Sequence, residues 1–319
     1  MRLIFFGSAE FGVPCLCAMH EDGGIDIAHI FTQPSRKAGR GRKLVPTPVA
    51  VWADENGVPY TEAENINSPE MVEKVAACKA ELLVVIAFGQ YISGKVIDLH
   101  KYRAINVHGS LLPKYRGAGP IYWPIINGDA ETGITIITVE KKMDTGDMLG
   151  NAKIAIEADD DAQSVHDKLA EISPPVLIDC IRKIADGTAV YTPQDESQAT
   201  EAPKLQKSDG FIDWADTAES INNRIRGLWP WPGVQVDFVS QATGKSCRVT
   251  IAKAEIVSCS KEEAECGTID DEENIVCGDG CLKIMRIKPA GGKVMDFKSF
   301  VNGRAVCAGD VFKSVESGG

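Results

Sequence analysis

The first half of the chain alternates apolar, β-branched runs with helix-like segments, and this alternation limits the folds open to it. Strand-like runs occupy residues 2–6, 25–32, 81–89, 104–108, 133–139 and 151–156. The run 81–89, ELLVVIAFG, is apolar almost throughout, as expected of a strand covered on both faces. The pattern predicts an α/β domain with a doubly wound, mostly parallel sheet, whose ligands bind beyond the carboxyl ends of the strands.

Helix signals lie between these runs. Thr47 is a plausible N-cap with Pro48 at the first helical position, and Gly57 ends that segment. Ser68 and Pro69 begin a second helix in the same way. Residues 160–187 are mainly helical in pattern, although Pro174 and Pro175 are expected to break or kink that helix.

The composition and periodicity of the sequence change after residue 188. Residues 189–207 are polar, contain proline and show no periodicity, which predicts a linker. One helical segment, 217–228, is followed by short strand-like pieces at 234–239, 246–257, 267–270 and 274–289. We therefore expect a domain over residues 1–188, a linker over 189–207 and a small β-barrel or sandwich over 208–319.

Composition narrows the class of protein. The chain has 319 residues, 44% of them hydrophobic, and a net charge of -11, so its total charge gives no hint of a polyanion partner. Its ten cysteines include no C-x-x-C, and no histidine follows His166, so no metal site is expected, even at Cys277 and Cys281. Scattered free thiols, and an N-terminus that looks like a strand rather than a signal peptide, favour the cytoplasm. The longest uncharged run, 82–94, is shorter than the ~18–20 residues of a membrane span.

A polar pair ends the strand 104–108. Asn106 and His108 are two positions apart, so their side chains project from the same face of the strand. An amide and an imidazole placed together can stabilise the oxyanion of a tetrahedral intermediate, and the imidazole can alternatively act as a general base. The structural alternative is that Asn106 caps a turn and His108 is an ordinary hydrogen-bonded residue.

A second polar segment, 140–149, follows the strand 133–139 and contains Asp144 in an Asp-Thr-Gly turn. Such turns are common, so the motif alone favours an ordinary turn. If the two strands are neighbours, Asp144 can orient His108 or accept a proton from an attacking amine. The sequence contains no G-x-G-x-x-G, P-loop, G-x-S-x-G or H-E-x-x-H motif, which argues against nucleotide phosphate binding, serine nucleophiles and zinc hydrolysis.

Two segments are basic against the acidic total. Residues 36–43 hold five cations and no acid, with two glycines between them. Residues 281–304 hold six cations and one acid. Each is either a solvated surface or a grip for the phosphates of a nucleic acid or another anion.

Taken together, these segments resemble the methionyl-tRNA formyltransferases, which formylate the methionine carried by initiator tRNA. The resemblance covers essentially the whole chain and rests on FTQPSRKAGRGRKLVPTPV, INVHGSLLPKYRGAGPI, MDTGDML, DWADTAESINNRIRGLWPWPG and LKIMRIKPAGGK. H-G-S-L-L-P with D-T-G indicates only the wider 10-formyltetrahydrofolate superfamily, whereas A-G-R-G and W-P-G indicate the tRNA enzymes. The chain departs from the family at Ser8 and Ala9, where Thr-Pro is more usual.

The resemblance implies a Rossmann-like N-terminal domain that binds the folate, a C-terminal OB-like β-barrel that binds tRNA, and no metal. It implies that Asn106, His108 and Asp144 are catalytic. The implied folate-binding residues are Ser110, Leu111, Leu112, Pro113, Ile86, Phe88 and Gly89. The implied tRNA-binding residues are Arg36, Lys37, Arg40, Arg42, Lys43, Lys283, Arg286 and Lys288.

Three other functions stay open from the sequence. A formyltransferase acting on an amino-sugar nucleotide would share the chemistry but is expected to lack the basic A-G-R-G arm. A hydrolase of formyl-tetrahydrofolate would use water in place of the amine. A non-catalytic RNA-binding protein would retain the fold alone, which the intact set of Asn106, His108 and Asp144 argues against. Nothing in the sequence suggests more than a monomer.

Overall fold

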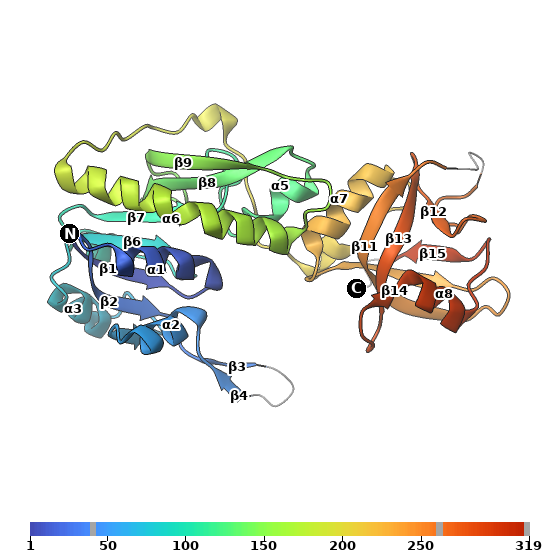
Figure 1. Cartoon of the computed structure of the whole chain (residues 1–319), viewed down its shortest axis with the longest axis horizontal. Helices are drawn as coiled ribbons and strands as arrows, with labels where there is room; N and C mark the ends of the chain where they lie inside the picture. The colour runs from blue at the N-terminus through green and yellow to red at the C-terminus, as the bar shows by residue number, and fades with distance from the viewer. Residues whose placement is uncertain (39–42, 260–263, 316–319) are drawn as a thin grey trace. The chain divides into compact units, whose positions relative to one another are not determined.

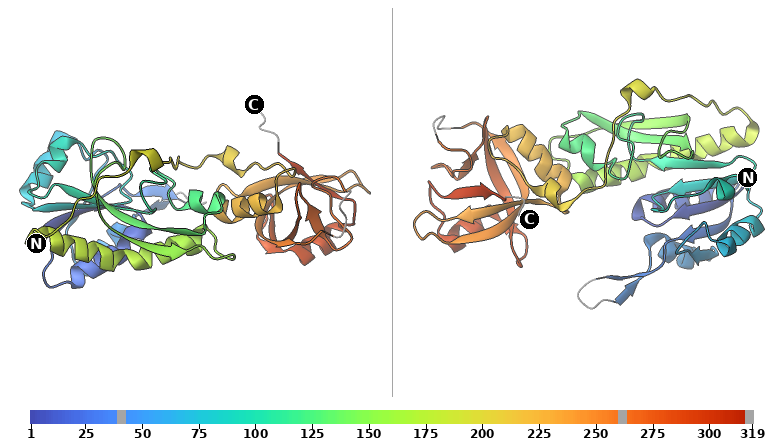
Figure 2. Two further views of the ribbon diagram at one scale, coloured as in Figure 1. Left: turned by 90° about the horizontal axis from the view of Figure 1, so that it is seen from above. Right: turned by 180° about the vertical axis from the view of Figure 1, so that it is seen from behind.

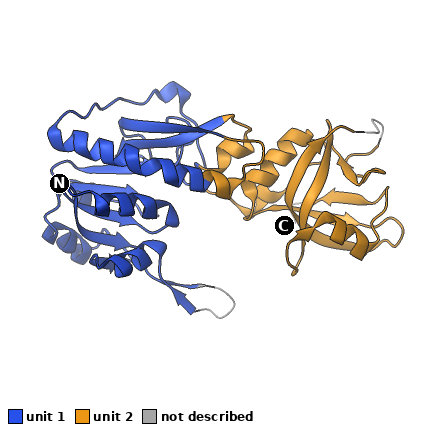
Figure 3. Ribbon diagram, viewed as in Figure 1, with its two compact units in different colours: residues 1–120, 131–155, 166–202 blue, residues 121–130, 156–165, 203–319 orange. Residues whose placement is uncertain are grey.

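The computed structural model of the chain describes residues 1–38, 43–259 and 264–315 (Figure 1). It divides into two units (Figure 3). Unit 1 comprises Met1–Pro120, Glu131–Ala155 and His166–Ala202, and unit 2 comprises Ile121–Ala130, Ile156–Val165 and Pro203–Gly319. The first part of the predicted linker therefore belongs to unit 1.

Unit 1 is built on a seven-stranded sheet with the order β5-β2-β1-β6-β7-β8-β9. Neighbouring strands are parallel from β5 to β7, whereas β8 pairs antiparallel with both β7 and β9. This confirms the predicted doubly wound, mostly parallel sheet. The strands are β1 (Arg2–Gly7), β2 (Asp26–Thr32), β5 (Tyr60–Glu62), β6 (Leu82–Ile86), β7 (Ala104–His108), β8 (Glu131–Thr138) and β9 (Met148–Ala155).

The strand order reverses between β1 and β6, because β2 and β5 lie on one side of β1 and β6 and β7 on the other. Such a switch point opens a crevice at the carboxyl ends of the strands. Helices α1 and α6 cover one face of the sheet and α3 covers the other (Figure 2, left). The helical segments before residue 187 are η1 (Glu10–Gly12), α1 (Val13–Glu21), α2 (Pro48–Asn56), α3 (Pro69–Ala77), α4 (Gly94–Ile97), α5 (Tyr122–Ile126) and α6 (Ala162–Asp186).

The predicted helix starts are confirmed. The Thr47 hydroxyl accepts a hydrogen bond from Ala50 N at 3.1 Å, and Pro48 is the first residue of α2. Gly57 ends α2 in the left-handed conformation, with φ +66°. The Ser68 hydroxyl accepts from Met71 N at 3.4 Å and caps α3. Local side-chain chemistry therefore sets these boundaries.

Helix α6 differs from the prediction, because it continues unbroken through Pro174 and Pro175. Two prolines cost local hydrogen bonds, but the apolar side chains on both sides of them are buried, Leu169 and Ala170 before and Leu177 and Ile181 after. Packing of this continuous apolar face offsets the local loss.

The basic segment 36–43 forms the base of an antiparallel hairpin. Strand β3 (Arg36–Ala38) pairs with β4 (Lys43–Val45), with Lys37 opposite Leu44. Residues 39–42, which include Arg40 and Arg42, lie outside the described residues.

Unit 2 carries an antiparallel curled sheet of six strands, ordered β12-β13-β11-β10-β15 with β14 beside β13. It confirms the OB-like C-terminal domain. The predicted strand at 267–270 forms only isolated bridges, Thr268 to Val311 and Ile269 to Ile275. The elements after residue 190 are η2 (Glu196–Gln198), η3 (Lys207–Gly210), α7 (Ala218–Leu228), β10 (Val234–Val239), β11 (Ser246–Val257), β12 (Asn274–Val276), β13 (Cys281–Pro289), β14 (Met295–Asp296), α8 (Phe297–Arg304) and β15 (Val311–Ser314).

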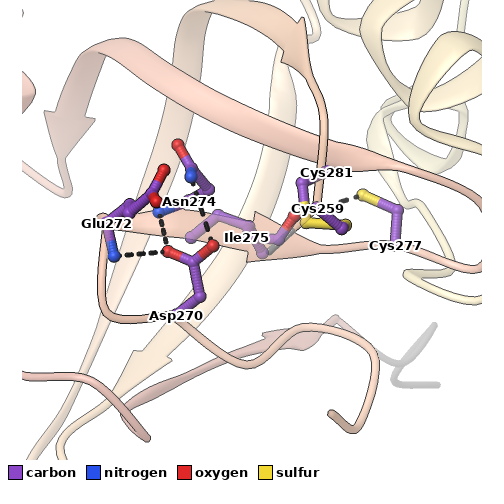
Figure 4. The surroundings of a disulfide bond; sticks show 7 residues. All are labelled: Cys259, Asp270, Glu272, Asn274, Ile275, Cys277 and Cys281. Carbon is purple, nitrogen blue, oxygen red and sulfur yellow. Dashed lines mark hydrogen bonds between the residues drawn. A yellow bond between two sulfur atoms is a disulfide. The ribbon is translucent and has the colours of Figure 1, made fainter. Parts of the chain in front are cut away.

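A disulfide in unit 2 corrects the expectation that the thiols are free (Figure 4). Cys259 and Cys281 are bonded, with their Cα atoms 5.2 Å apart. The register explains the pairing, because Val257 at the end of β11 lies opposite Cys281 at the start of β13. The spacing of the two cysteines in the sequence does not predict this cross-strand contact. Cys277, also drawn in Figure 4, donates to Ile275 O at 3.6 Å and stays free.

No helix in the described part of the chain is long and apolar enough to cross a membrane.

The buried His100 makes the stability of unit 1 sensitive to acid. Its side chain is 4% exposed, Nδ1 contacts Ala80 O at 3.0 Å, and no described residue forms a hydrogen bond with Nε2. Burial lowers the pKa of His100 below its ordinary 6.5, more than the Ala80 carbonyl raises it. Below about pH 6.5 the unfolded chain therefore binds a proton that the folded chain does not. The free energy of unfolding consequently decreases as the pH is lowered.

We expect His100→Gln to weaken this acid sensitivity. The test compares urea midpoints at pH 7.5 and pH 5.5, and the gap between them should narrow relative to wild type. His20→Gln, at an exposed histidine, is the matched control. An unchanged gap in His100→Gln would contradict the assignment, whatever the variant's stability at pH 7.5.

Candidate active site

Strand β7 presents two of the three predicted catalytic residues at the carboxyl end of the parallel part of the sheet. Asn106 is half-buried, and its side chain makes no hydrogen bond to any residue that the structure describes. His108 is 5% exposed. Because strand side chains alternate, the two share one face of β7. Asn106 therefore offers an uncommitted amide beside a buried imidazole.

The two ring nitrogens of His108 face different groups. Nε2 lies 2.9 Å from Tyr115 O, and because a carbonyl can only accept, this fixes the proton of neutral His108 on Nε2. Nδ1 lies 3.6 Å from Asp144 Oδ2. That distance is too long for a hydrogen bond but close enough for strong electrostatic attraction once the ring is protonated.

Asp144 lies in the connection between β8 and β9 and is only 12% exposed at its side chain. Its backbone is in the left-handed region, with φ +54°. Its Oδ2 accepts a hydrogen bond from Gly117 N at 2.9 Å. The structure thus brings Asp144 to His108, as the sequence predicts for neighbouring strands.

The predicted folate segment 110–113 is held against β8. Ser110 is fully buried, and its hydroxyl donates to Lys114 O at 2.7 Å. The Thr135 hydroxyl donates to Ser110 O at 2.7 Å and accepts from Leu112 N at 3.1 Å. Leu111 and Pro113 are half-buried, whereas Leu112 is 7% exposed. These bonds fix the main chain of the segment.

The second predicted folate segment ends β6. Ile86 and Phe88 are buried, and the Phe88 ring contacts Phe6 with centroids 5.1 Å apart. A ligand here would therefore meet the main chain rather than these two side chains. Gly89 has φ +75°, and a Cβ on it would lie 2.5 Å from Gln33 Nε2.

Sequence reasoning missed the polar groups that line the switch point between β1 and β6. The Gln33 side chain donates to Phe88 O at 2.8 Å and accepts from Arg36 Nη2 at 2.7 Å. The Ser8 hydroxyl accepts from Gln33 N at 3.0 Å. Ser8, where the family more often has threonine, thus supplies a hydroxyl to this network. Gln33 lies three residues before the basic segment, but a lone glutamine gives no signal of such contacts.

Sequence reasoning also missed residues around the Asp144 loop. Gln194, in the predicted linker, bonds to the main chain of the loop and to Arg116, which lies three residues after the predicted folate segment. Thr200, also in the predicted linker, accepts from Tyr115 N. No periodicity or motif marks these residues, because their partners are distant in the chain.

The predicted tRNA-binding residues fall in both units. Arg36, Lys37 and Lys43 are exposed on the hairpin of unit 1. Lys283, Arg286 and Lys288 are exposed on β13 of unit 2. Strand pairing adds a cation that the sequence windows missed, since Lys253 of β11 lies opposite Arg286. None of these four cations of unit 2 forms an ion pair with another described residue. We refer to Lys253, Lys283, Arg286 and Lys288 as the β11–β13 basic face.

Over residues 1–38, 43–259 and 264–315, no group of three or more His, Cys, Asp or Glu side chains is arranged to hold a metal ion.

Comparison with known families identifies the class of protein. Residues 1–181 match the model for the formyl transferase family, and residues 204–305 match the model for the formyl transferase C-terminal domain. The chain therefore belongs to the formyl transferases, and it is an enzyme of the transferase class.

Curated relatives then place it among the methionyl-tRNA formyltransferases. It is 39% identical to the methionyl-tRNA formyltransferase of Caldanaerobacter subterraneus subsp. tengcongensis, over 98% of this chain and 100% of that protein. It is 37% identical to that of Geobacter metallireducens, over 95% of this chain and 96% of the relative.

Solved structures share the fold at low identity. An N-formyltransferase from Helicobacter canadensis, in complex with folinic acid and dTDP-3-aminofucose, superposes with a TM-score of 0.63 at 16% identity. That match covers 92% of this chain and 100% of the other. Glycinamide ribonucleotide transformylase 1 from Symbiobacterium toebii gives a TM-score of 0.52 at 16% identity, over 61% of this chain and 94% of the other.

Gly146 is required for the position of the Asp144 loop. A Cβ at Gly146 would lie 1.8 Å from Thr138 O, a backbone atom that cannot move aside cheaply. We expect Gly146→Ala to destabilise the protein by about 1–3 kcal/mol, as overpacking does. Urea unfolding checks this, with Gly23→Ala as the control, since a Cβ there meets nothing within 4 Å. Equal stability of the two variants would contradict the close approach.

Proposed function

We propose that the chain transfers the formyl group of 10-formyltetrahydrofolate to the α-amine of methionyl initiator tRNA, giving N-formylmethionyl-tRNA for translation initiation. The observation that carries the proposal is the site at the end of β7. There His108 Nδ1 lies 3.6 Å from Asp144 Oδ2, beside the uncommitted Asn106 amide. Membership among the methionyl-tRNA formyltransferases supports the choice of substrates.

The α-amine attacks the formyl carbon, and the formyl oxygen becomes an oxyanion. The Asn106 amide donates to this oxyanion. Because Nε2 of His108 already donates to Tyr115 O, Nδ1 is the ring atom left for the reaction. Protonated His108 donates through Nδ1 to the same oxyanion, and Asp144 stabilises the protonated ring and takes the proton that the amine loses. When the tetrahedral intermediate collapses, the bond to folate N10 breaks and the proton held by Asp144 passes to N10, so charge and atoms balance.

Each predicted domain has a part in this proposal. Within residues 1–188, the main chain of 110–113 and of 86–89 lines the pterin and formyl pocket, which suits segments whose carbonyl and amide groups are fixed. The β3–β4 hairpin contacts the acceptor region of the tRNA. Within residues 208–319, the β11–β13 basic face binds tRNA phosphates, since its cations form no ion pair among the described residues that would have to break first.

The proposal includes a monomer acting in the cytoplasm, where charged initiator tRNA and reduced folates are present. A molar mass of one chain, 34.4 kDa, in light scattering is the expected result.

His108→Ala tests the site directly. Purified protein is mixed with 10-formyltetrahydrofolate and methionyl initiator tRNA, and formyl-methionyl-tRNA is measured. Loss of an oxyanion donor is expected to lower the rate about 10² to 10³-fold. His20→Ala, at an exposed histidine, should keep the wild-type rate.

The products separate the remaining alternatives. Formate release without formyl-methionyl-tRNA would mean a hydrolase, and transfer to an amino-sugar nucleotide alone would mean the sugar enzyme. A wild-type rate for His108→Ala would contradict the proposed role of His108 in the reaction.

The β11–β13 basic face is tested by salt dependence. We expect alanine at Lys283, Arg286 and Lys288 together to flatten the slope of log K against log salt by about 2–3, since each lost phosphate contact removes about 0.7–0.9. A filter-binding titration of initiator tRNA at several salt concentrations measures it. The triple variant Lys79→Ala, Lys95→Ala and Lys245→Ala removes three exposed lysines elsewhere and should leave the slope unchanged. Equal slopes for the two triple variants would exclude this face.

A further inference from the structure

The polar segment 192–202 is fixed along unit 1 rather than free. At its start, Thr192 and Met148 exchange backbone hydrogen bonds of 2.8 and 2.9 Å. At its end, Arg116 N donates to Thr200 O at 2.8 Å and Ala202 N donates to Arg116 O at 2.7 Å. We call residues 192–202 the strap. It joins β9, which begins just after Asp144, to the loop that follows His108.

Gln194 lies at the point where the strap meets the Asp144 loop. Its Nε2 donates to Asp144 O and to Gly146 O, both at 2.8 Å. Its Oε1 accepts from Arg116 Nε at 3.0 Å and from Arg116 Nη2 at 2.7 Å. A primary amide has two N–H donors and two lone pairs, so this side chain is fully satisfied. The opposite orientation would set an oxygen against two carbonyl oxygens, so only one orientation fits.

Arg116 anchors Gln194 from the other side. It is 9% exposed, and its guanidinium also binds Glu196 through Nη1 at 2.9 Å and Nη2 at 2.7 Å. This bidentate hydrogen bond is the main reason that the pKa of Arg116 is raised. Arg116 therefore bonds to Gln194 through Nε and Nη2 and to Glu196 through Nη1 and Nη2, which holds the guanidinium between these two side chains.

These contacts close a ring around the catalytic carboxylate. Gln194 holds the main chain of Asp144, Arg116 holds Gln194, and Gly117, the next residue, donates to Asp144 Oδ2 at 2.9 Å. The ring is also tight, because a Cβ at Gly117 would lie 2.6 Å from Ala202 O of the strap. Asp144 itself has a left-handed φ of +54°, which a non-glycine residue keeps only when its surroundings hold it.

We propose that Gln194 is a positioning residue for formyl transfer, which fixes the Asp144 loop and thereby the Asp144 carboxylate against His108. Gln194 touches neither His108 nor a substrate in this role, and its effect passes through Asp144. The inference rests on the proposed function for its consequence, a change in rate, but not for its geometry.

A double-mutant cycle tests it. Gln194→Ala should lower kcat about 10 to 10²-fold, because a misplacement of about 1 Å costs up to 10²-fold. KM for both substrates should stay near wild type, since the lost interaction acts in the transition state. In an Asp144→Ala background the same substitution should lower the rate by less than about twofold, because the group it positions is gone. An equal loss in both backgrounds would overturn the proposal.

The matched control is Gln198→Ala. Gln198 is the same residue type on the same strap and is exposed, and Asp195 Oδ2, at 2.7 Å, is the only partner of its Nε2 among the residues that the structure describes. It should retain the wild-type kcat. If Gln198→Ala matched the loss in Gln194→Ala, the effect would come from loosening the strap as a whole, and the specific role would be refuted.

Hydrogen exchange gives a readout that needs no activity. Gln194→Ala should speed exchange at the Gly117 amide, which loses its fixed acceptor, and Gln198→Ala should not. If wild type transferred no formyl group, the proposed function would fail, yet this measurement would still decide whether Gln194 holds the carboxylate. Unchanged exchange at Gly117 would overturn the positioning role even in an active enzyme.

Discussion

The antiparallel pairing of β8 with β7 is the constraint on which the site depends. It places Thr135 opposite His108, so the Thr135 hydroxyl can hold both Ser110 O and Leu112 N. The chain that leaves β8 then returns toward β9 close enough for Gly146 to touch Thr138 O and for Asp144 to face His108. A β8 paired elsewhere would separate the imidazole from the carboxylate. The reversed direction of β8 within the seven-stranded sheet is therefore what brings the imidazole and the carboxylate together.

Most polar groups at this site already have hydrogen-bond partners, and these bonds limit the movement of the reacting side chains. His108 Nε2 is held by Tyr115 O, Asp144 Oδ2 by Gly117 N, and Gln194 by four hydrogen bonds. What is left uncommitted is the Asn106 amide and the 3.6 Å space between Nδ1 and the carboxylate. Fixed dipoles need little reorganisation when charge develops in a transition state, so a site with few free groups, correctly placed, suits oxyanion chemistry. These hydrogen bonds also hold the loops in place, so the side chains that the loops carry keep their positions relative to one another.

Features set by neighbouring residues could be predicted from the sequence, and those set by distant contacts could not. The Thr47 and Ser68 caps are local, and the buried β6 run and the i, i+2 spacing of Asn106 and His108 are read directly from periodicity. The Cys259–Cys281 bond, the continuity of α6 through Pro174, and Lys253 facing Arg286 all arise from strand register or helix burial. Gln194 was hidden for the same reason. A polar segment without periodicity looks like a linker, because nothing local distinguishes a solvated glutamine from one bonded to three residues far away in the chain.

The net charge of the chain and the charge of its basic face have opposite signs, and they act over different distances. A net charge of -11 repels polyanions over distances of about a Debye length, roughly 10 Å at 0.1 M salt. Short-range attraction must then come from cations outside ion pairs, and Lys253, Lys283, Arg286 and Lys288 form no ion pair among the described residues, although Glu255 lies opposite Lys283 and Asp296 opposite Arg286. Arg248, which is also on β11, is by contrast paired with Asp237 at 2.6 Å and contributes little net charge to that strand. An acidic protein with a few unpaired cations binds an RNA that fits them and repels one that does not. The acidic total therefore favours selectivity rather than opposing RNA binding.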